Sequence, residues 1–69
     1  MLKGFVVFVG HMEIRAMRST PAGMVQACQS EADSYQVFQR HADREAELRR
    51  TEANFDTAFS YAVRRAILH

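Results

Sequence analysis

Hydrophobic residues near the N-terminus follow a pattern typical of β-strands. Residues 5–9 are continuously apolar, and from residue 12 apolar and polar positions alternate. Val, Phe and Ile fit a pleated surface well, and alternation marks a half-buried strand. Gly10-His11 separates the two runs, and a two-residue loop with glycine first matches a type II′ turn. We therefore expect a β-hairpin over about residues 4–17, although one strand over 5–17 with a bulge at Gly10 fits the same pattern.

The expected turn determines which side chains share a face of the hairpin. One face would pair Phe8 with Glu13 and Val6 with Arg15, so its charged residues mark it as exposed. Val6 and Phe8 then remain as apolar residues that nothing covers. Because an isolated two-stranded hairpin is marginally stable in water, we expect a second copy or a partner protein on that face. The opposite face would be wholly apolar, through the pairs Val9–Met12, Val7–Ile14 and Phe5–Ala16.

The rest of the chain favours helix. Residues 24–69 contain no glycine or proline, and Ser19 or Thr20 can cap a helix that starts at Pro21. Helical spacing relates a first set of apolar positions, Met24, Cys28, Tyr35, Phe38 and Ala42. A charged stretch follows, and a second apolar stripe then runs from Phe55 to Ile67, with Thr51 or Asn54 placed to cap it.

Two arrangements of this region fit the pattern. In the first, two helices span about residues 21–50 and 54–68. In the second, one helix of about 48 residues would be roughly 70 Å long and would need an intertwined oligomer. Charged residues would interrupt the seam of that long helix, so we favour two helices. The sequence thus predicts a single α+β domain over residues 1–69, with both helices folded onto the apolar face of the hairpin.

The short chain and its single cysteine indicate self-association. A domain of this size buries only about 60% of its unfolded surface, so it usually needs disulfides, a metal or oligomerisation. Cys28 is the only cysteine, which excludes an intrachain disulfide and fits a reducing, cytoplasmic location. We interpret it as a small buried residue on a helix. His11, His41 and His69 lack the spacing of a metal site, so we expect a homo-oligomer, a dimer or larger, without a cofactor.

Several other functions are disfavoured by the sequence. The apolar run over residues 5–9 is shorter than the roughly 7–15 residues of an export signal or the 20 of a membrane helix, so we expect no membrane association. A lone glycine in the turn does not make a phosphate-binding loop. Catalysis by Cys28 would need an activating base, yet His41 would lie nearly 20 Å away along one helix. We therefore expect that the protein is not an enzyme.

These considerations favour a non-catalytic regulatory or interaction protein. It would associate with itself and cover a surface on a partner protein, because apolar positions are left over on the hairpin. The candidate contact residues lie on the exposed hairpin face and in the charged region that follows, at Val6, Phe8, Arg15, Arg40 and Arg44.

A dimeric DNA-binding regulator is the alternative. The two ends of the chain are basic and the middle is acidic, so an oligomer can bring arginines from both ends to one face and onto phosphates. No aromatic residues are interleaved with these arginines to stack on bases, and nearby Glu and Asp neutralise them, so nucleic acid is the less favoured partner. The arginines in question are Arg15, Arg18, Arg64 and Arg65.

Overall fold

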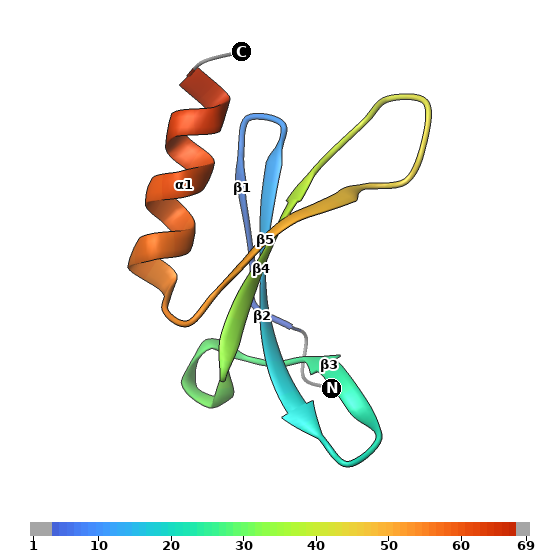
Figure 1. Ribbon diagram of the computed structural model, residues 1–69, viewed down its shortest axis with the longest axis vertical. Helices are drawn as coiled ribbons and strands as arrows, with labels where there is room; N and C mark the ends of the chain where they lie inside the picture. The colour runs from blue at the N-terminus through green and yellow to red at the C-terminus, as the bar shows by residue number, and fades with distance from the viewer. Residues whose placement is uncertain (1–3, 68–69) are drawn as a thin grey trace.

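An antiparallel sheet carries one C-terminal helix on one of its faces (Figure 1). The computed structural model describes residues 4–67. The strands follow the order β1-β2-β4-β5, and β3 also pairs with β2. Within the described residues the elements are β1 (Val6–Val9), β2 (Met12–Thr20), β3 (Gly23–Gln26), a short 3-10 helix η1 (Gln29–Glu31), β4 (Ser34–Gln39), β5 (Glu47–Glu52) and α1 (Phe55–Ile67).

The N-terminal hairpin forms with the predicted register. Val9 pairs with Met12, and the ladder continues through Val7–Ile14. Gly10 has φ +57°, and no non-glycine residue between 4 and 67 has positive φ, as a type II′ turn with glycine first requires. The turn also lies against α1, because a Cβ atom on Gly10 would approach the Ala66 Cβ to 3.3 Å.

The predicted helix over residues 21–50 is wrong, and so is the single long helix. The chain there forms β3, η1, β4 and β5. Ser34–Gln39 pairs along Met12–Met17 of β2, so distant sequence partners override the local helical preference. The helical spacing in this region was coincidental. Cys28 is half-buried and lies between β3 and η1 rather than on a helix.

The C-terminal helix does exist and is nearly as long as predicted. It spans Phe55–Ile67, against the expected 54–68, of which residue 68 lies outside the described range. Asn54 caps it, since its Oδ1 accepts hydrogen bonds from the Thr57 backbone N–H at 2.9 Å and from the Thr57 hydroxyl at 2.8 Å. Ala58 and Ala62 are fully buried, because small side chains four residues apart let the helix lie close to the sheet.

The core lies between α1 and the two central strands. Phe55 contributes an aromatic cluster, with its ring 5.6–5.8 Å from the rings of Phe5, Tyr35 and Phe59. The six residues predicted for the apolar hairpin face all belong to this core or pack against it. Its buried members are Met12, Ile14, Ala16, Tyr35, Val37, Ala58 and Ala62.

Candidate protein-interaction surface

On the sheet face opposite α1, eight side chains of β1, β2, β4 and β5 form two cross-strand rows. Strand side chains alternate between faces, and the residues of β2 and β4 that belong to the core with α1, such as Ile14 and Val37, assign the other face to the helix. We call the eight residues the open face. One row is Phe8, Glu13, Phe38 and Leu48, and the other is Val6, Arg15, Gln36 and Thr51.

The first of these rows carries the large apolar residues. Phe8 is 58% exposed and Leu48 is 49% exposed, while Phe38 between them is half-buried. They extend from β1 at one edge of the sheet to β5 at the other. Three large apolar side chains therefore extend across β1, β2, β4 and β5 on a face that α1 does not cover.

Two arginines contact the rings of this row. The Arg15 guanidinium carbon lies 4.0 Å from the centre of the Phe38 ring, and Arg15 also forms an ion pair with Glu13. The Arg40 guanidinium carbon lies 5.0 Å from the centre of the Phe8 ring. Such contacts hold the cation against the aromatic face. Among residues 4–67 the ion pairs do not include Arg40.

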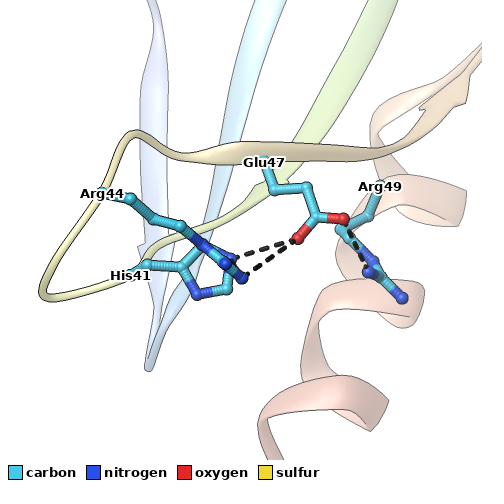
Figure 2. Close-up of polar contacts among 4 residues, drawn as sticks. All are labelled: His41, Arg44, Glu47 and Arg49. Carbon is cyan, nitrogen blue, oxygen red and sulfur yellow. Dashed lines mark hydrogen bonds and ion pairs between the residues drawn. The ribbon is translucent and has the colours of Figure 1, made fainter.

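A separate polar cluster joins the loop between β4 and β5 to the start of β5 (Figure 2). Glu47 lies at its centre, with one carboxylate oxygen 3.2 Å from His41 Nε2 and 3.9 Å from Arg44 Nη2. Its other oxygen accepts a hydrogen bond from Arg49 Nη1 at 3.1 Å. The His41 hydrogen bond and then the Arg49 charge lower the pKa of Glu47 below its usual value. Hydrogen bonding to Tyr61, and next the charge of Glu47, raise the pKa of Arg49.

The predicted partner-binding residues are largely brought together. Val6, Phe8 and Arg15 belong to the open face, and Arg40 lies beside it, over Phe8. Arg40 directly follows the end of β4, and this strand, rather than the predicted helix, brings it over Phe8. Arg44 lies apart in the β4–β5 loop, where it is directed at Glu47 (Figure 2).

The predicted DNA-contacting arginines do not form one patch. Arg15 is on the open face. Arg18 lies three residues further along β2, and its Nη1 is 3.7 Å from a carboxylate oxygen of Glu31 in η1. Arg64 and Arg65 belong to the last turn of α1, on the other side of the sheet. Within one copy, the four arginines are thus divided between the two sides of the sheet.

Sequence reasoning missed Phe38 and Leu48. The three-residue spacing from Tyr35 to Phe38 predicts a helix face. A strand signal is nevertheless present, since Tyr35 and Val37 alternate with Ser34 and Gln36 over a segment rich in strand-forming residues. Leu48 carries no comparable local signal, because charged residues surround it.

The described residues contain little else that is arranged for chemistry. No group of three or more His, Cys, Asp and Glu side chains lies close enough to hold a metal ion in residues 4–67. The Cys28 thiol lies 3.3 Å from the Ser30 hydroxyl. Two open hollows border the β4–β5 loop, one lined by Arg44–Glu47 and the other by His11 and residues 39–42. The helix found in residues 4–67 is neither long nor apolar enough to cross a membrane.

Comparisons with known proteins found no match, so any inference about function rests on the geometry. The chain matched no protein-family model, no curated protein and no solved structure.

Proposed function

We propose that the protein is a non-catalytic interaction protein that associates with itself and binds a surface of a partner protein. The observation that carries this proposal is the row of Phe8, Phe38 and Leu48 on the open face. Removing apolar surface from water contributes about 25 cal/mol per Å², and exposed apolar patches on small domains mark interaction sites.

The composition of the open face indicates the chemistry of the partner surface. Aromatic residues and arginine are enriched in protein interfaces, and here Arg15 and Arg40 lie over the rings of Phe38 and Phe8. Glu13 already pairs with Arg15, while no ion pair among residues 4–67 includes Arg40. A fitting partner presents an apolar surface with a carboxylate at its rim, placed to meet Arg40.

Self-association is supported by the thinness of the domain. Within residues 4–67, Ile14 and Val37 are the largest side chains with less than 2% exposure, and α1 covers a single face of the sheet. Oligomerisation is a common way for small domains to supplement such a core. A cytoplasmic location is part of the same proposal, since the single cysteine suits a reducing compartment.

Partner binding can be tested with substitutions on β4 and β5, the part of the open face that lies away from β1. A Phe38→Ala and Leu48→Ala double variant removes two members of the row, and Ile67→Ala is the matched control, because Ile67 is 76% exposed on α1. Tagged wild-type protein and the control should capture the same partner from a lysate of the source cells, and the double variant should lose it. Equal capture by all three would contradict the assignment of the open face.

The DNA-binding alternative has weaker support, because its four arginines lie on both sides of the sheet. Titration of duplex DNA at two salt concentrations separates the alternatives. Binding through phosphates weakens steeply as salt rises, whereas we expect no specific duplex binding.

A further inference from the structure

Strand β1 forms one edge of the sheet, and its backbone determines what that edge can bind. The Phe5 carbonyl accepts a hydrogen bond from Ala16 of β2 at 3.0 Å, so Phe5 faces β2. Hydrogen-bonding direction alternates along a strand, so Val7 and Val9 also face β2. Val6 and Phe8 therefore direct their N–H and C=O groups away from the sheet. Among residues 4–67, no other hydrogen bond takes up these four groups.

This edge lacks the features that usually prevent strands from pairing with other chains. Natural edge strands carry charges, prolines or bulges. Residues 5–9 have neither a charge nor a proline, and the β1–β2 ladder is continuous from Val6–Arg15 to Val9–Met12. The edge is therefore apolar, regular and open to pairing.

We propose that β1 pairs antiparallel with β1 of a second copy, about a two-fold axis at Val7. This inference rests on the self-association proposed above and specifies its geometry. Val6 would lie opposite Phe8 of the second copy, and the two such pairs would use all four outward N–H groups and carbonyls of the two edges. Val7 would face its own counterpart, so every cross-strand pair at the seam is apolar.

Charge on the neighbouring strand makes a small contribution in favour of this register. Glu13 lies beside Phe8 and Arg15 lies beside Val6. An axis at Val7 places Glu13 of one copy and Arg15 of the other in the same row, on either side of the apolar pair. An axis at Val6 would instead align the two Arg15 residues, and an axis at Phe8 would align the two Glu13 residues. Only the Val7 axis puts opposite charges across the seam.

The second copy fits this edge better than an unrelated peptide does. The apolar segment is self-complementary, because any antiparallel overlap of residues 5–9 places apolar residues against each other. Pairing also joins two open faces into one continuous surface, which doubles the area offered to a partner.

Cysteine pairing between differently substituted copies tests the register. Val6→Cys and Phe8→Cys are made separately, each with Cys28→Ser, and are oxidised with glutathione disulfide alone and as an equal mixture. Directly opposed residues have Cα atoms about 5.5 Å apart, within disulfide range, whereas two copies of either single variant place their cysteines further apart. We expect crosslinked dimer in the mixture at about tenfold or more above either variant alone.

A proline variant tests the backbone bonds by a second route. Phe8→Pro removes an outward N–H, which an edge strand tolerates, so the hairpin should fold and the dimer should weaken about 30-fold through two lost hydrogen bonds. Phe8→Ala keeps the N–H and is the matched control. If dimers persist but the mixture does not crosslink preferentially, the β1 pairing is overturned while self-association stands. If wild-type protein is monomeric, both fall, and partner binding through Phe38 and Leu48 is still decided by its own capture experiment.

Discussion

The two edges of the sheet are built in opposite ways. At one edge, β5 is almost entirely polar, and its charges pair within the strand through Arg49–Glu47 at 3.1 Å and Arg50–Glu52 at 2.6 Å. Its pairing with β4 also shifts register between Val37 and Phe38. At the other edge, β1 is regular and wholly apolar. Charge and irregularity prevent strand addition, so the comparison indicates that one edge is closed to other chains and the other is open.

The closed edge is also tied to the rest of the molecule. Arg50 lies 5.0 Å from the ring centre of Tyr61 in α1, and the Glu47 cluster holds the β4–β5 loop against the start of β5 (Figure 2). The charged side chains of β5 thus contact other groups of their own domain. Strand β1 has no charged side chain and leaves the outward N–H and C=O groups of Val6 and Phe8 unpaired among residues 4–67, and this contrast is what the following experiments probe.

The largest expected effect on stability comes from a substitution in the central strand β2, because both edges of the sheet depend on the core. Ile14 lies in β2 with no exposed surface, and its truncation to alanine should reduce the free energy of unfolding by about 3 kcal/mol through lost burial and a cavity. Thr51→Ala, on the open face of β5, should change it by less than about 0.5 kcal/mol. Urea unfolding followed by circular dichroism measures both. A loss at Thr51 as large as that at Ile14 would contradict the assignment of the core.

A lysine at each edge tests the contrast directly. Phe8→Lys places two ammonium groups in the proposed apolar seam, so the dimer dissociation constant should rise about 100-fold. Thr51→Lys adds the same group to β5 and should leave that constant unchanged. Analytical ultracentrifugation of both variants decides the matter, and similar dissociation constants for the two would remove the distinction between the edges.

Salt should have a smaller effect on the dimer. Because the seam is apolar and its nearest charges lie on the adjacent strands, the dimer dissociation constant should change less than about threefold between 0.1 and 0.5 M NaCl. The measurement is made on wild-type protein by fluorescence anisotropy of a labelled copy. A steep rise with salt would instead show that charged residues make the interface.

The smallest effect concerns the Glu47 cluster. The pKa of Glu47 is lowered in the folded protein, so its charged form favours folding. That contribution is fully present above the pKa of the unfolded state and is lost as the pH falls through the lower folded pKa. Glu47→Gln should therefore weaken the dependence of stability on pH below about pH 4.5, slightly, because the pair is exposed. An unchanged dependence would mean that the His41 and Arg49 contacts do not stabilise the fold.

The first hairpin and the C-terminal helix could be predicted from the sequence, because both depend on residues close together in the chain. The Gly10 turn determines the register of β1 and β2, and Asn54, one of the two predicted caps, is the one that starts α1. Strand β4 was missed because its stability comes from pairing with β2, more than 15 residues away, and its own residues also fit helical spacing. Strand β5 depends in turn on β4, and its charged sequence has no apolar alternation to reveal it.

The same division applies to the candidate interaction surface. Val6, Phe8 and Arg15 followed from the hairpin register alone. Arg40 was predicted on a helix and reaches the surface only because β4 brings it over Phe8. Placing Phe38 and Leu48 in this surface requires the strand order β1-β2-β4-β5, which no local pattern in the chain specifies.

The pairing of two β1 edges is tested most directly by sedimentation equilibrium of the wild-type chain beside Phe8→Lys at micromolar concentration. We predict twice the chain mass for the wild type and a single chain mass for the variant, with both folded by circular dichroism. A single chain mass for the wild type, or twice that mass for both proteins, would contradict the proposed pairing.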